Sequence, residues 1–336
     1  MKEILYIGNK LSCHGNNVTS IETLGRLLEA EGYTLHYASS KKNIYIRMIH
    51  MIYNVVKHSQ SVDYIFIDTY STTNFWYALV VSQMCRLFRI KYIPKLHGGD
   101  LPKRLENSSF LSNLIFKNAY INIAPSEYLY KAFMEKGYSN IKYIPNTIEI
   151  EKYSFKEKTF DYPRLLWVRS FSKIYNPILA VKVIIELKKK YPMSTLCMIG
   201  PKKDASYEET IQFAKENNVE LLITGKLTKT EWTALSVNYN IFINTTHFDN
   251  TPISVIEAMS LGFPIVSTDV GGIPYLIEHD VSGFLSPDDD HDAMVKNIER
   301  IILNHNKVKS VIKNACEKVE KFDWEIIKKE WIELLK

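Results

Sequence analysis

Short apolar runs alternate with helix-like stretches from the start of the chain. The first run, EILYIG, is followed by a helix-like stretch that ends at Gly32, and the same alternation continues to about residue 145. Strands separated by helices predict β-α-β units and a parallel sheet. The predicted strands of this first half are 3–8, 33–38, 63–69, 91–96, 120–124 and 141–145.

A charged stretch without periodicity, 146–163, interrupts the alternation and predicts a linker. Beyond it the pattern restarts, and the tail from Asp288 to Lys336 predicts consecutive helices with Trp324 and Trp331 as packing anchors. The length of 336 residues exceeds one ordinary core and suits two domains. The predicted strands of the second half are 164–168, 195–200, 219–224, 240–244 and 264–268.

These patterns predict an α/β fold with two Rossmann-like, doubly wound parallel-sheet domains that face a central cleft. Ligands of such sheets bind beyond the carboxyl ends of the strands. The predicted boundaries are 1–150 for the N-terminal domain, 151–320 for the C-terminal domain and 321–336 for a C-terminal helix that packs back toward the first domain.

The composition indicates the class of protein and its cellular compartment. The chain is 46% apolar and 24% charged, which is typical of globular proteins, and no apolar run approaches the ~18 residues of a membrane span. Its beginning, MKEILYIGNK, is interpreted as a first strand and not as a signal peptide. The four cysteines form no CxxC pair, which argues against structural zinc and for a reducing compartment. We therefore expect a cytoplasmic protein.

The positive charge is concentrated in the first half. Residues 1–150 hold 17 Lys and Arg against 11 Asp and Glu, a balance of +6, whereas residues 151–336 hold 25 against 26, a balance of −1. This split predicts an anionic partner near the first half, such as a membrane surface or a phosphorylated substrate; a generally basic proteome is the alternative. The mild pI of 8.7, without a basic–aromatic stripe, argues against nucleic acid. No GxGxxG opens either half, which disfavours an NAD oxidoreductase.

One carboxylate is isolated within an apolar helix-and-strand unit. In DNTPISVIEAMSLGFPIVSTDVGG, residues 249–272, Glu257 is the only charge between Pro252 and Thr268. A helix is predicted with Thr251 as its N-cap, Pro252 at its first position and Gly262 at its end.

The free amides at the start of this helix favour an anion, especially a phosphate. If Glu257 faces a cleft, its ionised carboxylate accepts hydrogen bonds from a diol. The alternative is a narrow solvent-facing strip made of Ser254, Glu257 and Ser260.

Loops with related chemistry follow several strands of the second half. They are RSFSK at 169–173, IGP at 199–201, TGKL at 224–227 and DVGG at 269–272. The carboxyl ends of parallel strands meet at one rim, so these loops predict a pocket with cations, bare backbone and one acceptor carboxylate. Such a pocket suits a nucleoside diphosphate.

Three segments resemble a known family. FDNTPISVIEAMSLGFPIVSTDVGGIPYLIEHDVSGFL, 248–285, closely resembles the C-terminal signature of retaining glycosyltransferases with the GT-B fold, family 4. LHGGDLP, 96–102, resembles the first-domain loop that faces the donor sugar. APSEYLYKAFMEKGYSNIKYIPNTIE, 124–149, is similar to the family's segment before the linker. The chain departs from the family at Asp249, where Glu is most usual, and at Val168, where Gly is usual.

The resemblance implies a role for each matching position. Glu257 would bond the ribose hydroxyls, and Asp249 the hydroxyls of the transferred sugar. Arg169 and Lys173 would neutralise the diphosphate, although four positions separate them here and five in the family. The implied catalytic residues are His97, Arg169, Lys173 and Asp249. The implied donor-binding residues are Gly15, Gly225, Lys226, Leu227, Asn250, Thr251, Pro252, Ile253, Ser254 and Glu257.

The implied activity is a retaining transfer of sugar from a nucleoside-diphosphate sugar to a glycan or lipid-linked glycan acceptor in cell-surface glycan synthesis. Cations and helix amides would stabilise the leaving diphosphate. No DxD pair suited to a metal is present, so neither a metal nor another cofactor is expected, and DDDHD, 288–292, is interpreted as a solvated loop and helix start. The alternatives are an epimerase-like GT-B enzyme and a non-catalytic sugar-nucleotide binding protein.

The stretch 43–59 is amphipathic, with Arg47, His50, Asn54, Lys57 and His58 on one narrow face. It predicts either a packing helix of the first domain or a helix that lies on an anionic membrane, which would make the protein peripheral to the inner membrane face. His14, beside Gly15, would touch a substrate or be merely exposed. The proposed lipid-facing cations are Lys41, Lys42, Arg47, Lys57, Lys103 and Arg104.

Overall fold

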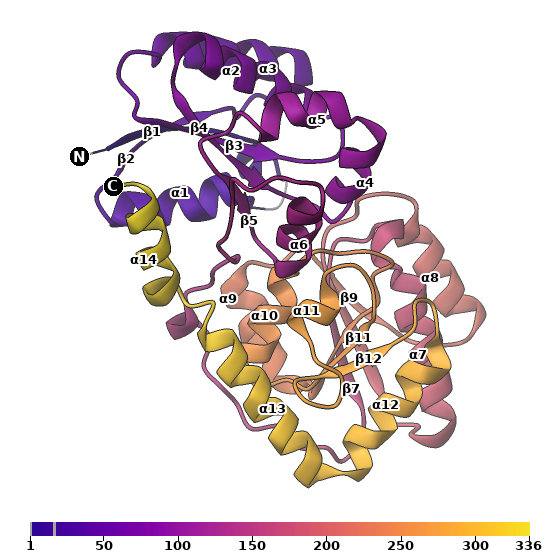
Figure 1. Cartoon of the computed structure of the whole chain (residues 1–336). Coiled ribbons are helices and arrows are strands. Elements are labelled where there is room, and N and C mark those ends of the chain that lie inside the picture. The colour runs from indigo at the N-terminus through magenta and orange to yellow at the C-terminus, as the bar shows by residue number, and fades with distance from the viewer. Residues whose placement is uncertain (1, 16–17) are drawn as a thin grey trace. The chain divides into compact units, whose positions relative to one another are not determined.

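The structure, a computed structural model, describes residues 2–15 and 18–336 and divides into two compact units (Figure 1). The first unit comprises Met1–Pro145 together with Lys329–Lys336, and the second comprises Asn146–Lys328. Each unit contains one six-stranded sheet in which every pair of neighbouring strands is parallel. The predicted α/β architecture of two doubly wound sheets is confirmed.

The sheet of the first unit has the strand order β2-β1-β3-β4-β5-β6. Because the order reverses between β1 and β3, the switch point where such sheets bind ligands lies there. The strands are β1 (Glu3–Ile7), β2 (Thr34–Ala38), β3 (Tyr64–Thr69), β4 (Lys91–Leu96), β5 (Asn122–Ala124) and β6 (Ile141–Tyr143). The helices are α1 (Ser20–Ala30), α2 (Ile44–Lys57), α3 (Phe75–Phe88), α4 (Leu101–Asn107), α5 (Ser109–Phe116) and α6 (Glu127–Glu135), with the 3-10 turn η1 (Ser12–His14).

Helices cover both faces of this first sheet (Figure 1). On the face toward α2 and α3, Leu5 and Ile7 of β1 are buried with Met51 and Phe75. On the other face Tyr6 packs edge-on against Phe66, whose ring lies 5.5 Å from that of Trp331 near the end of the chain. Trp331 belongs to α14 (Trp324–Leu334), so the last turns of this helix complete the core of the first unit.

The second sheet has the strand order β12-β11-β10-β7-β8-β9. In chain order this is 6-5-4-1-2-3, the order of dinucleotide-binding Rossmann sheets, and its switch point lies between β7 and β10. The strands are β7 (Arg164–Val168), β8 (Thr195–Ile199), β9 (Leu222–Gly225), β10 (Ile241–Asn244), β11 (Ile265–Thr268) and β12 (Phe284–Ser286). The helices are α7 (Pro177–Lys190), α8 (Ser206–Glu216), α9 (Lys229–Leu235), α10 (Ile253–Ser260), α11 (Ile273–Leu276), α12 (His291–Leu303) and α13 (His305–Glu320), with the 3-10 turns η2 (Ile150–Lys152), η3 (Lys173–Tyr175) and η4 (Ser236–Asn238).

Alternate residues of the central strand of this sheet enter different cores. Leu165 and Trp167 pack with α7 and α12, whereas Leu166 packs with α10 on the opposite face. The predicted strands and main helices of this unit are found, but β12 and α11 were not predicted. Both are short and lie among Gly, Pro and Asp residues, which are typical of loops.

Candidate active site

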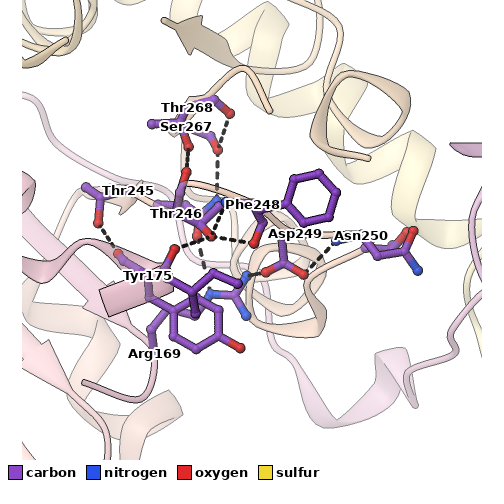
Figure 2. Close-up of polar contacts among 12 residues, drawn as sticks. Arg169, Tyr175, Thr245, Thr246, Phe248, Asp249, Asn250, Ser267 and Thr268 are labelled. Atoms are coloured by element: carbon purple, nitrogen blue, oxygen red, sulfur yellow. Dashed lines mark hydrogen bonds and ion pairs between the residues drawn. The ribbon is translucent and has the colours of Figure 1, made fainter. Parts of the chain in front are cut away.

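Arg169 and Asp249 meet at the switch point of the second sheet. Arg169 directly follows β7, and its Nε donates to Asn244 Oδ1 at the end of β10 at 3.3 Å. Its Nη2 forms an ion pair with Asp249 Oδ2, and its guanidinium lies 4.8 Å from the ring centroid of Tyr175 (Figure 2). The two charged side chains are 13% and 18% exposed. The structure thus brings together two of the predicted residues that lie 80 positions apart.

The loop that carries Asp249 is held by close backbone packing. The Asn250 amide donates to Asp249 Oδ1 at 2.8 Å, and the Gly272 amide donates to the Asp249 carbonyl at 2.9 Å. A Cβ at Gly271 would lie 2.3 Å from the Asp249 carbonyl oxygen, and one at Gly272 would lie 2.1 Å from that of Asn250. The paired glycines of DVGG are therefore required for the two loops to touch.

The ends of β7, β8 and β9 are joined in the same way. The Arg169 amide donates to the Ile199 carbonyl at 3.0 Å, and the Gly200 amide donates to that of Gly225 at 2.8 Å. A Cβ at Gly200 would lie 1.7 Å from the Arg169 carbonyl oxygen, which no side chain can occupy. This glycine lets the backbone of Arg169 approach β8, and it fixes where the guanidinium begins.

Helix α10 begins beside this loop, one residue later than predicted. Pro252, with φ −70° and ψ 118°, is its cap residue, so Thr251 is not the N-cap and Pro252 is not the first helical residue. The proline ring fixes φ but leaves ψ extended, and the Pro252 carbonyl accepts from the Val255 amide at 3.1 Å. Ser254 Oγ is buried and has no hydrogen-bond partner among the described residues.

Glu257 is a buried, anchored carboxylate. It is 4% exposed, and its Oε1 accepts from the Tyr153 hydroxyl at 2.6 Å and pairs with Lys229 Nζ at 2.7 Å. Burial and the carboxylate of Glu257 together raise the pKa of Tyr153 far above its usual value. Ser260 is also buried, so the alternative of a solvent-facing strip is wrong. Sequence reasoning missed Tyr153 and Lys229 because neither belongs to a motif.

Lys173 is placed differently from Arg169. Its ammonium group, on a side chain 70% exposed, lies 3.6 Å from Glu209 Oε1 of α8. Its backbone amide donates to Asp204 Oδ2 at 3.1 Å. The ammonium group is therefore engaged at the surface and not in the Arg169–Asp249 ion pair.

The predicted base-flanking loop begins at Gly225, the last residue of β9. Gly225 has a positive φ of 72°, Lys226 is exposed and Leu227 is half-buried against the apolar core around α10. Gly225 thus turns the chain at the rim where Arg169 and Gly200 lie.

In the first unit, His97 directly follows β4. Its Nε2 lies 2.7 Å from Asp68 Oδ1, and its ring stacks on that of Tyr70 with centroids 4.8 Å apart. Gly15 ends η1 with φ 83°, and His14 beside it is exposed, with Nε2 2.9 Å from the Ser40 carbonyl. Sequence reasoning did not identify Asp68, although an acid that ends the apolar run IFI was a usable signal.

Several other expectations concern ions and the membrane. Among the residues that the structure describes, no group of three or more His, Cys, Asp and Glu side chains could hold a metal ion. In the acidic run 288–292, Asp290 caps α12 by accepting from the Ala293 amide at 2.9 Å. All four cysteines are free. None of the helices in residues 2–15 and 18–336 has the length and apolar character needed to cross a bilayer.

Comparison with known proteins shows the family and the fold. Residues 149–318 match the family described as glycosyl transferases group 1, and the chain belongs to this family. The fold is that of GT-B glycosyltransferases. Sucrose-phosphate synthase from Thermosynechococcus elongatus superposes with a TM-score of 0.82 at 17% identity, covering 99% of this chain and 98% of that one. Anabaena HepE, solved with UDP and glucose, gives 0.80 at 18% identity, covering 100% and 99%.

Curated relatives are similar over shorter stretches. The amylovoran biosynthesis glycosyltransferase AmsK of Erwinia amylovora is 38% identical over 88 residues, which are 26% of this chain and 22% of that protein. The sulfoquinovosyl transferase SQD2 of Arabidopsis thaliana is 30% identical over 150 residues, 43% of this chain and 28% of that protein. The aligned part of the chain thus spans about a quarter of the length of these relatives.

Proposed function

We propose that this protein is a retaining glycosyltransferase. It moves a sugar from a nucleoside-diphosphate sugar to a glycan or lipid-linked glycan in cell-surface glycan synthesis. The observation that carries the proposal is the cluster at the switch point of the second sheet. There Arg169 pairs with Asp249, and the loop that carries Asp249 leads into the start of α10. Near the start of this helix Ser254 Oγ is buried without a partner among the described residues.

The ion pair suits an exchange of partners. A donor diphosphate would take over the guanidinium of Arg169, and hydroxyls of the transferred sugar would donate to Asp249. Each partly buried charge then keeps a partner, which limits the desolvation cost of binding. The Val255 amide is engaged by the Pro252 carbonyl, and the two amides before it, those of Ile253 and Ser254, would donate with Ser254 Oγ to the diphosphate or sugar. Lys173 would join by leaving Glu209.

The Glu257 carboxylate is held in a position to accept hydrogen bonds from a diol. Tyr153 and Lys229 both contact Oε1, and Oε2 accepts no hydrogen bond from the described residues. A carboxylate oxygen held in this way offers its remaining lone pairs to ribose hydroxyls without first having to be oriented. The roles proposed for Gly15, His97 and 225–227 rest on the resemblance of their motifs.

The proposed chemistry follows the movement of charge. Breaking the bond between sugar and phosphate leaves positive charge on the sugar and negative charge on the diphosphate. Arg169, Lys173 and the α10 amides would stabilise the leaving group, and a phosphate oxygen would help to deprotonate the acceptor. We expect transfer to continue in EDTA; activity lost in EDTA and restored by Mg²⁺ would contradict this expectation. Proton NMR of the new anomeric linkage tests retention.

The relatives narrow the choice of substrates. AmsK is named for amylovoran biosynthesis, and a related protein of Escherichia coli is named a putative colanic acid biosynthesis glycosyltransferase. HepE was also solved with UDP-glucose. We therefore place UDP-sugars first among donors and surface polysaccharide precursors first among acceptors.

A panel of nucleotide sugars, screened for thermal stabilisation, tests donor binding. A ligand that binds only the native state at 100 times its Kd stabilises by about 2.7 kcal/mol. We expect one nucleotide family to raise Tm in the wild type and much less in Arg169→Ala. Sugar interconversion without an acceptor would favour the epimerase-like alternative. Stabilisation without turnover on any acceptor would favour a binding protein, and no stabilisation by any nucleotide would contradict the proposal.

We also propose that the first unit docks on an anionic membrane through the outer face of α2. Met51 and Val55 bury one side of this helix in the core, and Arg47 is buried with them, its Nη1 donating to the carbonyls of Lys41 and Lys42. Arg47 was predicted to face lipid, which its burial contradicts. The outer face is instead apolar and exposed, at Tyr45, Ile46, Ile49, Tyr53 and Val56.

The surrounding charge favours anionic lipid as the partner of this face. Residues 32–62 contain four Lys and Arg and no Asp or Glu. Exposed apolar side chains beside Lys41, Lys42 and Lys57 match an interfacial helix, and each nearby cation contributes about 1 kcal/mol at an anionic surface.

Vesicle co-sedimentation tests this docking. The wild type should sediment with vesicles that contain anionic lipid, and less so as salt rises. Ile49→Ser with Tyr53→Ser should abolish sedimentation, whereas Leu303→Ser, which changes an exposed leucine of the second unit, should not. Equal recovery of wild type and double variant in the supernatant would remove the membrane proposal and favour a soluble acceptor.

A further inference from the structure

The first unit contains a buried carboxylate at its own switch point. Asp68, next to last in β3, is fully buried. Its Oδ1 accepts from the Tyr6 hydroxyl at 3.0 Å and lies 2.7 Å from His97 Nε2. Its Oδ2 is buried and has no hydrogen-bond partner among the described residues. An unpaired buried polar atom costs stability, so its retention calls for a functional explanation.

A buried cation balances this carboxylate. Lys95 lies beside Asp68 in the register of β3 with β4, and its Nζ donates to Ser20 Oγ, which is 3.1 Å from the Tyr6 hydroxyl. Burial lowers the pKa of Lys95 to about 8, against the opposing effect of Asp68. At pH 7 the Lys95 ammonium is therefore charged, and it lies on the strand next to the Asp68 carboxylate.

The neighbouring strand leaves room for the carboxylate. A Cβ on Gly8, which follows β1, would lie 2.7 Å from Asp68 Oδ2. Any larger residue there would displace Asp68 and, through it, the imidazole of His97. Glycine at this position therefore preserves the geometry of the pair.

The contact with Asp68 favours one tautomer of His97. An ionised carboxylate only accepts hydrogen bonds, so the proton of a neutral imidazole lies on Nε2, facing Asp68. Nδ1 is then an acceptor, and among the described residues the hydrogen bond found for the ring is the one at Nε2. The stacked ring of Tyr70, only 19° from parallel, restrains tilting of the imidazole.

We propose that Asp68 is a positioning residue that holds His97 with Nε2–H directed at the carboxylate and Nδ1 free to accept a hydrogen bond from a hydroxyl of a sugar substrate. The proposal rests on the proposed transferase function. It adds a requirement that the motif LHGGDLP does not contain: a carboxylate 29 positions before the histidine.

Nitrogen-15 NMR of histidine-labelled protein tests the tautomer without any substrate. With the His97 signals assigned by loss in His97→Gln, the wild type should show the Nε2–H form. Asp68→Asn should shift His97 toward the Nδ1–H form, because the amide can donate to Nε2. Tyr6→Phe, which removes the other hydrogen bond to Oδ1, should leave the tautomer unchanged. An Nδ1–H form in the wild type, or no change in Asp68→Asn, would overturn the proposal.

Steady-state kinetics then tests the role in turnover. In a serine protease, the corresponding Asp→Asn change lowers kcat about 10⁴-fold through the wrong tautomer. Here we expect Asp68→Asn to lower kcat at least about 10²-fold. The nucleotide affinity and the thermal stabilisation by nucleotide should change less than about twofold. Asp63→Asn, at a half-exposed carboxylate just before the same strand, is the matched control.

The outcomes separate the two proposals. A changed tautomer with full activity in Asp68→Asn would overturn the positioning role while the transferase function stands. A wild type that neither binds nor transfers any nucleotide sugar would contradict the function, and the NMR measurement would still decide whether Asp68 sets the tautomer. If Asp68→Asn does not fold, the wild-type tautomer still decides, because an Nδ1–H form would overturn the proposal.

Discussion

The two units place an acid beside a basic side chain at the switch point of their sheets, but in different ways. In the second unit Asp249 and Arg169 come from loops after the strands, and both are partly exposed. In the first unit Asp68 lies within β3, fully buried, and only its partner His97 approaches the surface. The pair in the second unit can exchange its partners for a ligand, whereas Asp68 in the first unit can only hold His97 in place.

Glycines support both arrangements by removing a side chain where backbone must come close. Gly200 lies against the Arg169 carbonyl, and Gly8 lies against the Asp68 carboxylate. The largest expected effect on stability follows from the contact between Gly200 and the Arg169 carbonyl. Gly200→Ala should destabilise the chain by about 3–5 kcal/mol, because its Cβ would clash with backbone that cannot move freely. Gly32→Ala, with positive φ but open space, should cost only about 1–2 kcal/mol. Chemical unfolding measures both, and equal costs would refute the close-packing argument.

Arg169→Ala should give the next largest effect. Removing one fixed donor to a developing anion typically lowers kcat about 10²- to 10³-fold. Arg164→Ala is the matched control, because Arg164 is the first residue of the same strand and pairs with Asp161 at 2.9 Å. Initial-rate assays with saturating donor and acceptor compare the two variants. Similar rates in the two variants would show that the Arg169–Asp249 pair is not part of the active site.

Glu257→Ala should weaken nucleotide binding by about 1.5–3 kcal/mol, the value of a hydrogen bond to a charged group. Glu299→Ala, which removes a carboxylate that pairs with Lys190 at 2.8 Å, should leave the affinity unchanged. Calorimetric titration measures the difference. Unchanged binding in Glu257→Ala would show that its anchoring by Tyr153 and Lys229 is purely structural.

The smallest effect compares two buried lysines. Burial lowers the pKa of both Lys95 and Lys158 to about 8, but only Lys95 has a buried carboxylate beside it. The shift from 10.5 to about 8 costs up to ~3 kcal/mol, and the bond from Lys158 Nζ to the Ser236 carbonyl returns about 1 kcal/mol. Lys158→Met should therefore stabilise the chain by about 1–2 kcal/mol at pH 7.

The pH dependence gives the sign of this effect. Between pH 8 and 10.5 the unfolded wild type binds more protons at Lys158 than the folded form, so wild-type stability rises with pH. The advantage of Lys158→Met should therefore shrink over this window. Lys95→Met should instead destabilise at pH 7, because it leaves Asp68 without its cation. Urea unfolding at several pH values checks both signs, and a constant difference for Lys158→Met would refute the charge argument.

Much of the fold was predictable because the sheets are parallel and buried. Runs such as RLLWV and NIFIN are strand-length, apolar and bounded by helix-like stretches, and both are strands in the structure. The three-residue β12 and four-residue α11 carry too few apolar residues to be distinguished from loops. Periodicity predicted an amphipathic α2, but it could not tell which side faces the sheet, and Arg47 is buried.

The site was predictable where it follows a motif. The resemblance pointed to Arg169, Asp249 and Glu257, although it could not show that the first two pair directly. Asp68 and Tyr153 escaped because their importance comes from contacts with His97 and Glu257, which are distant in sequence.

The central claim is that a diphosphate binds at the Arg169–Asp249 pair, which lies at the switch point of the second sheet. Calorimetry with the nucleoside diphosphate that stabilises the chain best, and with the corresponding nucleoside, tests it in the wild type and in Arg169→Ala. The account predicts that the wild type binds the diphosphate much more tightly than the nucleoside, and that Arg169→Ala reduces this gap by about 1.5–3 kcal/mol while nucleoside binding is unchanged. An equal gap in both proteins would contradict it.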